Sequence, residues 1–340
     1  MATSPAKPLA LTLGEAAGIG PDITLMSWLK RRAAALPPFY LLGDAAALTR
    51  RAERLGLKVP LAAVEPSQAI ATFDRALPVV DIGVNATAEP GRPDATSAPA
   101  AIAAIKRAVT DVAAGRAAAL VTNPIAKSVL YAAGFKHPGH TEFLAELAAS
   151  GGTVPHPVMM LWSDTLAVVP VTIHLPLREA IAALTPELIV RTCEITASDL
   201  SKRFGLARPR LALSGLNPHA GEDGSLGTED QAIIAPAVAQ LRAAGLDVRG
   251  PLPADTMFHT AARKSYDCAV CMYHDQALIP IKTLAFDDGV NVTLGLPFVR
   301  TSPDHGTAFD IAGSGRANPS SLIAALKLAA RMTPSASAAP

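Results

Sequence analysis

The sequence predicts an α/β protein whose sheets are largely parallel. Short runs of apolar and β-branched residues, such as 39–43 (FYLLG) and 118–122 (AALVT), alternate with longer segments of helical periodicity. Apolar runs this short are typical of parallel strands that helices cover on both faces. At 340 residues the chain is too long to fold around one small hydrophobic core, so we expect two domains or one large α/β unit.

The predicted elements follow one another in a regular strand–helix order. LALTL (9–13) is the first predicted strand, and a Gly-rich turn follows it. Pro21 and Asp22 open a helix, since proline suits the first helical position and aspartate complements the positive end of the helix dipole. Further strands are expected at 39–43, 77–82, 118–122 and 158–162, and further helices at 97–114, 186–203, 229–244 and 319–331. The tail 333–340 is expected to be disordered.

Composition excludes several classes of partner. Hydrophobic residues make up 50% of the chain, charged residues 17%, and the net charge is +1. This balance offers no electrostatic attraction to nucleic acid or to an anionic membrane. The sequence lacks both a bilayer-spanning apolar stretch of about 20 residues and the pattern of a secretory signal. With three cysteines and no disulfide framework, we expect a cytoplasmic protein.

Cys268 and Cys271 spell CxxC inside a predicted strand. Residues three apart on a strand point to opposite faces of a sheet, so the two thiols are expected to diverge. We therefore expect two buried core cysteines, and neither a redox pair nor a pair of zinc ligands.

Three histidines each lie just beyond a short apolar run that is predicted to be a strand. His174 follows LAVVPVTI, His219 lies past LALSG in GLNPHAG, and His274 follows CAVCMY. In parallel sheets, ligands collect outside the carboxyl ends of the strands. A single histidine in such a place is typical of a hydrogen-bonded loop residue. The repeated placement instead predicts one catalytic metal site, with open positions left for water or substrate.

The Gly-rich turn after the first strand matches no nucleotide-binding fingerprint. Gly18-Ile-Gly20 is followed by Pro-Asp-Ile, which departs from GxGxxG, and the Lys-Ser/Thr pair of a P-loop is missing. Any dinucleotide is therefore not expected to be held in the usual Rossmann way. The sequence assigns no cofactor-binding residue.

Lys282, Asn291 and Arg300 follow His274 in strongly apolar surroundings. An unpaired buried charge is costly, so the cations Lys282 and Arg300 favour an anionic partner. A phosphorylated or carboxylated substrate would supply that partner.

Two further segments carry candidate residues whose roles stay open. In GHTEF, His140 and Thr141 place an imidazole and a hydroxyl ahead of a predicted helix, although Thr141 alone would also suit an N-cap. Asp255, in PLPADTMF, is a candidate helix cap, a candidate group for orienting a metal ligand, and a candidate catalytic carboxylate.

An ordered set of motifs resembles one known family. The motifs are GEAAGIGPD, GHTEF, TIHLPL, GLNPHAGE, GPLPADT, MYHDQ and NVTLGLPFVRTSPDHGTAFDIAG. They are similar to those of the 4-hydroxythreonine-4-phosphate dehydrogenase family of vitamin B6 biosynthesis, from about residue 9 to 330. The family usually reads GEPAGIGP, and this chain has Ala16 in place of that proline.

The resemblance implies a homodimer with active sites at the subunit interface. It also implies the two-domain α/β/α fold shared with isocitrate and isopropylmalate dehydrogenases. We expect residues 1–135 and 301–340 to form the first domain. Residues 136–300 are expected to form the second, with the metal site and the dimer interface.

By the same resemblance, the metal ligands are His174, His219 and His274, and the metal is zinc, cobalt or magnesium. The implied substrate contacts are His140, Thr141, Lys282, Asn291 and Arg300. The implied reaction is NAD- or NADP-dependent oxidation of 4-phosphooxy-L-threonine to 2-amino-3-oxo-4-phosphooxybutanoate, which decarboxylates to 3-amino-2-oxopropyl phosphate on the way to pyridoxal 5′-phosphate. Lys282 and Asp255 are the candidate general bases.

Other functions remain compatible with the residues. Paralogous dehydrogenases act on four-carbon sugar-acid phosphates or cis-dihydrodiol carboxylates, and three histidines also suit a zinc hydrolase. A non-catalytic metal-binding protein would leave the cationic residues near the histidines unexplained. The sequence alone decides neither the coenzyme nor the native metal.

Overall fold

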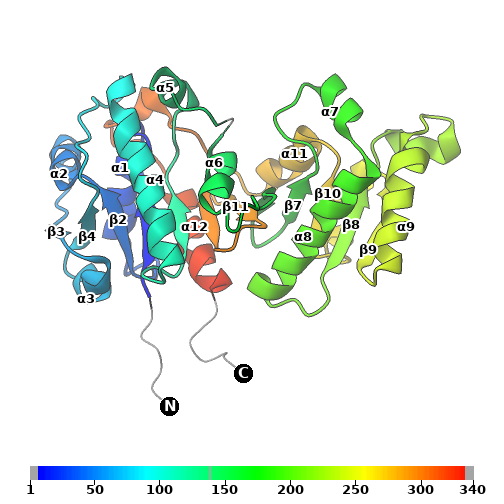
Figure 1. Cartoon of the computed structure of the whole chain (residues 1–340), viewed down its shortest axis with the longest axis horizontal. Coiled ribbons are helices and arrows are strands. Elements are labelled where there is room, and N and C mark those ends of the chain that lie inside the picture. Colours follow the sequence, from blue (N-terminus) through cyan, green and yellow to red (C-terminus); the bar gives the residue numbers. More distant parts are fainter. Residues whose placement is uncertain (1–6, 138, 334–340) are drawn as a thin grey trace, which may run out of the picture. The chain divides into compact units, whose positions relative to one another are not determined.

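The computed structural model describes residues 7–137 and 139–333, so the predicted tail lies almost wholly outside the described residues. Strands and helices alternate as expected (Figure 1), and the chain folds into two compact units. The first unit runs to Pro157 and resumes at Leu296, and the second is Val158–Gly295. None of the helices in the described residues is long and apolar enough to cross a membrane.

The observed boundaries, after residue 157 and before residue 296, differ from the approximate domain boundaries expected at residues 135 and 300. The segment between residues 136 and 157 belongs to the first unit because its helix, α6 (His140–Leu147), buries Phe143 and Leu144 in that unit's core. Sequence patterns indicate where a helix forms, but only packing decides which core it joins.

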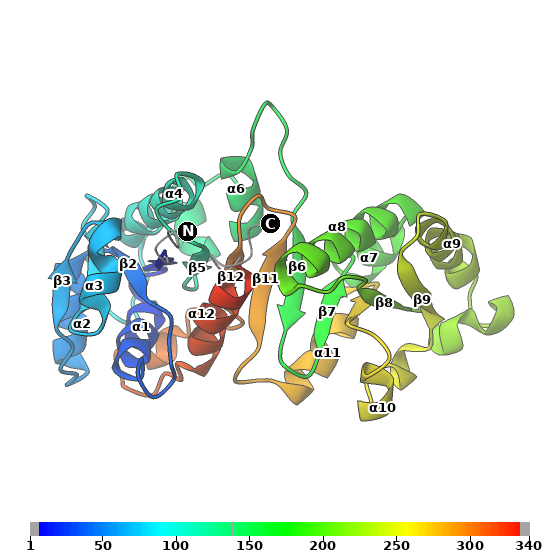
Figure 2. The ribbon, with the colours of Figure 1, turned by 90° about the horizontal axis from the view of Figure 1, so that it is seen from below.

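The first unit is built on a parallel sheet. Its strand order is β3 (Leu61–Ala63), β4 (Leu77–Asp81), β2 (Phe39–Gly43), β1 (Leu9–Thr12), β5 (Leu120–Thr122) and β12 (Arg300–Pro303). Figure 2 shows α4 (Ala98–Ala113) and α6 on one face, and α1 (Gly20–Leu29) and α12 (Ser320–Met332) on the other. Burial on both faces explains why the central strands β1 and β2 are mostly apolar.

The first unit contains three further α-helices among the described residues. They are α2 (Ala45–Arg54), α3 (Ala69–Phe73) and α5 (Lys127–Ala132). Asp44 caps α2 by accepting a hydrogen bond from the Ala46 amide at 2.8 Å, so the helix begins directly after β2.

The second unit has a mixed sheet. Its order is β11 (Val290–Leu294), β6 (Val158–Trp162), β7 (Ala167–Pro170), β10 (Cys268–Cys271), β8 (Arg210–Ser214) and β9 (Asp247–Leu252). Strand β6 pairs antiparallel with β11 and β7, whereas β7, β10, β8 and β9 are mutually parallel. The expectation of largely parallel sheets is confirmed.

Helices cover both faces of this second sheet (Figure 2). They are α7 (Leu177–Ala183), α8 (Pro186–Phe204), α9 (Ala235–Ala243), α10 (Thr260–Arg263) and α11 (His274–Leu284). The predicted helix at 229–244 begins with a π-helical turn, Asp230–Ile234, before α9. Cys268 and Cys271 are free and buried, as expected, and burial raises the pKa of the Cys271 thiol to about 12.

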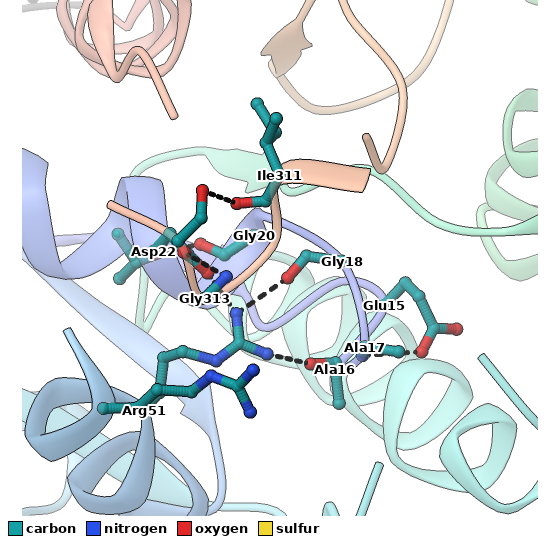
Figure 3. A network of polar contacts seen from close by, with 12 residues as sticks. Glu15, Ala16, Ala17, Gly18, Gly20, Asp22, Arg51, Ile311 and Gly313 are labelled. Atoms are coloured by element: carbon teal, nitrogen blue, oxygen red, sulfur yellow. Dashed lines mark hydrogen bonds and ion pairs between the residues drawn. The ribbon is translucent and has the colours of Figure 1, made fainter. Parts of the chain in front are cut away.

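A buried ion pair anchors the turn after β1 (Figure 3). Arg51 on α2 pairs with Asp22 on α1, and both side chains are almost fully buried. The Arg51 guanidinium also donates to the carbonyls of Gly18 at 2.9 Å and Ala16 at 2.7 Å. Asp22 in turn accepts the amide of Gly313 at 2.8 Å. One pair thus joins α1, α2, the turn after β1 and a loop near the end of the chain.

Replacing Arg51 by Ala should destabilise the protein strongly. The change leaves the Asp22 carboxylate buried without its partner, and breaking such pairs costs about 3–5 kcal/mol. Urea denaturation would measure the loss in free energy of unfolding. The matched control is Arg75→Ala, at an exposed arginine, which should change the free energy of unfolding little. An Arg51→Ala protein as stable as that control would contradict the stabilising role of the Asp22–Arg51 pair.

Candidate active site

The three strand-end histidines lie at one edge of the second unit's sheet, His174 and His219 on the segments after their strands and His274 as the first residue of α11. Strands β7, β10 and β8 are parallel neighbours, so their carboxyl ends share that edge. His174 follows β7, His274 follows β10, and His219 follows β8. Parallel sheets bind ligands at this edge.

Two of the histidines lie next to each other. The ring centroids of His174 and His274 are 5.6 Å apart. Two imidazoles on one tetrahedral zinc, with Zn–N about 2.0–2.1 Å, would place their centroids about 5 Å apart. The Nδ1 atom of His274 is hydrogen-bonded to the Asp275 carboxylate at 2.7 Å, which directs its Nε2 atom away from that carboxylate. Carboxylate–histidine pairs of this kind orient metal ligands in proteins. These two residues therefore fit a metal ion.

His219 lies on a loop with unusual backbone geometry. Six consecutive residues, 219–224, have positive φ angles. The buried Asp230 carboxylate holds the start of this loop by accepting the amides of Leu216 at 2.8 Å and Asn217 at 3.1 Å. In the part of the chain that the structure describes, no three His, Cys, Asp or Glu side chains are grouped to hold a metal. The described residues thus bring His174 and His274 together, but not His219 with them.

Gln276 links the strands that precede His219 and His274. Its Oε1 atom accepts hydrogen bonds from the Met272 amide and the Ser214 hydroxyl, both at 2.7 Å, and its Nε2 atom donates to the Gly215 carbonyl at 2.8 Å. The MYHDQ motif by itself assigns this glutamine no role. Its position two residues after a candidate ligand was the only available signal.

The other candidates of the second unit occupy more open positions. Asp255 is exposed within the 3-10 turn Ala254–Thr256 and is not its cap, because Pro253 precedes the turn. Lys282 is half-buried on the last turn of α11, and its ammonium lies 5.6 Å from the Phe286 ring centroid. Asn291 on β11 is half-buried opposite Leu161.

Arg300 in the first unit is deeply buried. Arg300 is the first residue of β12, and only 4% of its surface is exposed. Burial lowers the pKa of its guanidinium to about 10. The Thr122 hydroxyl, at the end of β5, accepts hydrogen bonds from Arg300 Nη2 at 2.7 Å and Nε at 3.2 Å. Thr122 thereby fixes the plane of the guanidinium. No local sequence pattern connects Thr122 with Arg300, because the two residues are 178 positions apart.

His140 lies beside Arg300. Its Nδ1 atom is 3.4 Å from Arg300 Nη2, and its Nε2 atom is buried with no hydrogen-bond partner among the described residues. Burial, and then the charge of Arg300, lower the pKa of His140 well below its usual value, so the imidazole is neutral. Gly139 is the N-cap of α6, and Thr141 lies inside the helix, so the N-cap alternative for Thr141 is wrong.

Comparison with known proteins identifies the family. Residues 35–329 match the model of the family described as pyridoxal phosphate biosynthetic protein PdxA. The chain belongs to this family. It is 71% identical to the 4-hydroxythreonine-4-phosphate dehydrogenase of Bradyrhizobium diazoefficiens over 340 residues, which cover 98% of this chain and 99% of that one.

Solved structures of related dehydrogenases superpose on nearly the whole chain. The 4-hydroxythreonine-4-phosphate dehydrogenase of Klebsiella pneumoniae superposes with a TM-score of 0.85 at 37% identity, covering 97% of this chain and 99% of that one. A terephthalate 1,2-cis-dihydrodiol dehydrogenase of Burkholderia xenovorans superposes with a TM-score of 0.64 at 29% identity, covering 96% and 98%. Membership in the PdxA family makes this chain a dehydrogenase connected with pyridoxal phosphate biosynthesis.

Thr122→Val should weaken substrate binding through Arg300. Valine keeps the β-branched shape but removes the acceptor, and each buried donor left unsatisfied costs about 1–3 kcal/mol. We expect KM for the hydroxy-acid substrate to rise more than kcat falls, and Thr122→Ser to restore the wild-type KM. A Thr122→Val enzyme with unchanged KM would show that the hydroxyl does not position Arg300.

Proposed function

We propose that the protein oxidises 4-phosphooxy-L-threonine with NAD or NADP. The observation that carries this proposal is the group formed by Thr122, His140 and Arg300, which presents a buried cation beside a neutral imidazole. A buried guanidinium of fixed orientation suits a phosphate or carboxylate, because it offers paired N–H donors. The names of the most similar relatives agree with a phosphorylated hydroxy-amino acid.

The proposed chemistry begins at the C3 hydroxyl of the substrate. The hydroxyl proton goes to a base, and the hydride on C3 goes to the nicotinamide ring. The product of this oxidation is 2-amino-3-oxo-4-phosphooxybutanoate. This β-keto acid then loses CO2 to give 3-amino-2-oxopropyl phosphate. A divalent metal, when bound, supplies Lewis acidity that favours ionisation of the hydroxyl. Lys282 and Asp255 remain the candidate bases, together with Thr141 and Asn291 as further substrate contacts.

We also propose that the metal site is completed in a homodimer. The resemblance implies active sites at a subunit interface, and the grouping of only two of the three histidines within the described residues is consistent with that. The second unit exposes large apolar side chains that a second copy would cover: Leu177 at 56% and Ile181 at 38% on α7, and Ile279 at 65% and Phe286 at 75% on and after α11. Exposed apolar side chains of this size favour a protein interface.

Replacing His174, His219 or His274 by Ala should remove bound zinc and activity, because each change removes one nitrogen ligand. Elemental analysis of zinc-loaded protein measures the metal, and light scattering should still give about twice the 35.0 kDa chain mass. His259→Ala, an exposed histidine of the same unit, is the control. Full metal occupancy in all three variants would disprove the metal site. An active monomer would disprove a metal site shared between two subunits.

Arg300→Ala should lower kcat/KM for the phosphorylated substrate by about 30-fold or more, the cost of losing a buried charge-assisted contact. Metal content should stay unchanged, since arginine is not a metal ligand. Unphosphorylated 4-hydroxythreonine should be a far poorer substrate for the unmodified enzyme. Steady-state kinetics at 340 nm measure both effects, with Arg75→Ala as the control.

Equal kcat/KM for the phosphorylated and unphosphorylated compounds would overturn the substrate assignment. The dihydrodiol dehydrogenase, 29% identical, would then make a cis-dihydrodiol carboxylate the next substrate to test, with the Arg300 cation facing a carboxylate.

A further inference from the structure

The segments that carry the candidate metal ligands of the second unit are connected through one residue, Met272. Its backbone amide donates to Gln276 Oε1 at 2.7 Å, and its carbonyl accepts the Thr172 hydroxyl at 2.8 Å. Met272 precedes His274 by two residues, and Thr172 precedes His174 by two. Both backbone polar groups of Met272 are therefore held by side chains that lie close in sequence to a candidate ligand.

Thr172 reinforces the contact between two segments just beyond the paired parts of their strands. Strands β7 and β10 are parallel neighbours. After their last paired residues, the Thr172 amide reaches the Met272 carbonyl at 3.3 Å, which is longer than most backbone hydrogen bonds. The buried Thr172 hydroxyl adds a bond of 2.8 Å to the same carbonyl. This side chain thus holds the segment before His174 against the segment before His274.

Gln276 makes the corresponding connection to the segment of His219. Its Oε1 atom accepts the Ser214 hydroxyl at 2.7 Å, and its Nε2 atom donates to the Gly215 carbonyl at 2.8 Å. Gly215 is packed closely against the turn that follows it. A Cβ atom placed on Gly215 would lie 2.8 Å from the Cα atom of Ala220, the neighbour of His219. A shift of Gly215 would therefore be passed on to His219.

Two of the candidate ligands have strained backbones. His174 and His219 are left-handed, with φ angles of 53° and 54°. This conformation is unfavourable for residues with a Cβ atom, because that atom approaches the following carbonyl oxygen. Such strain persists where the surrounding structure over-determines it, and it is common at functional sites. The contacts of Thr172 and Gln276 lie on the segments directly before these two histidines, where they can maintain the strained conformation.

The long range of these contacts separates them from ordinary buried hydrogen bonds. The buried Thr196 hydroxyl on α8 donates to the Thr192 carbonyl at 2.7 Å, a bond that stays within one helix. In contrast, the Thr172 bond joins residues 100 positions apart, and the Gln276 bond to Gly215 joins residues 61 positions apart. Each of the segments joined in this way carries a candidate ligand.

We propose that Thr172 and Gln276 are positioning residues for the three histidines. Thr172 holds His174 beside His274, and Gln276 fixes the segment of His219 on the same edge of the sheet. The proposal rests on the proposed metal site and deepens it, because a metal ion requires its ligand atoms to be held in place. Removing residues that orient metal ligands typically costs about 10–100-fold in metal affinity.

The test is zinc titration of the full-length protein in competition with a chromophoric chelator. Thr172→Val keeps the β-branched shape but removes the hydroxyl, and it should weaken zinc binding about tenfold or more. Thr172→Ser should restore the wild-type affinity. The matched control is Thr196→Val, which removes another buried hydroxyl of the same unit and should bind zinc like the wild type.

Thermal unfolding of the zinc-free proteins separates positioning from stability. Thr172→Val and Thr196→Val each lose one buried hydrogen bond, so their Tm values should fall by similar amounts while only the first loses zinc affinity. The absorption bands of bound Co²⁺ depend on the geometry of its ligands, so Thr172→Val should change them and Thr196→Val should not.

Gln276→Met tests the second positioning residue. Methionine has a similar length but leaves the three polar partners of Gln276 unsatisfied, so both the Tm and the zinc affinity should fall. If this variant does not fold, Ser214→Ala takes its place, because it removes one of the three bonds and should also weaken zinc binding.

An unchanged zinc affinity in Thr172→Val, or in the folded variant at the Gln276 contacts, would overturn the role of that residue. An equal loss of affinity in Thr196→Val would overturn both roles. Wild-type protein that binds no zinc would overturn the proposed metal site and the positioning roles with it. Zinc binding that depends on the three histidines, but not on Thr172 or Gln276, would leave the metal site standing and overturn the positioning roles alone.

Discussion

The buried pair of Asp22 and Arg51 is the interaction on which the carboxyl edge of the first sheet depends. The turn after β1 leaves backbone carbonyls of Ala16 and Gly18 inside the protein, where an unpaired acceptor is costly. Arg51 supplies donors to both carbonyls and to Asp22, and Asp22 then has an oxygen left for the Gly313 amide. Burial lowers the pKa of Arg51, and the Asp22 carboxylate opposes that shift. The ion pair is therefore a connector between segments more than a source of net stability.

In the second unit, a neutral side chain provides hydrogen bonds for buried groups at the strand ends. Gln276 satisfies backbone and hydroxyl groups at the ends of β8 and β10, directly beside the loops of His219 and His274. An amide both donates and accepts, so it can join two strand ends without a buried charge. His174 and His219 are exposed, and His274 is half-buried at the start of α11, so the three imidazoles are at least partly accessible to a metal or substrate.

Arg300 is a buried cation whose orientation is fixed by a neighbouring hydroxyl. The guanidinium is deeply buried and is held in one plane by Thr122. Burial, and then the charge of Arg300, lower the pKa of the neighbouring His140 well below its usual value. A desolvated cation interacts more strongly with an anion than an exposed one, because the local dielectric is low. The neutral imidazole is available to accept or donate a single hydrogen bond, without adding a second positive charge.

The sequence by itself determined much of the fold, together with the family. Strands such as 39–43 and 158–162 appear as predicted, and the ordered motifs lead to a family that the comparisons support, because apolar periodicity and motif order are local properties of the chain. Only the tertiary structure decided which distant side chains meet. Thr122 and Arg300, or Asp22 and Arg51, acquire their roles from strand register and helix packing, which no local pattern encodes. Tertiary packing likewise places α6 in the core of the first unit. It leaves Asp255 exposed within a 3-10 turn that it does not cap, and within the described residues it does not group His219 with His174 and His274.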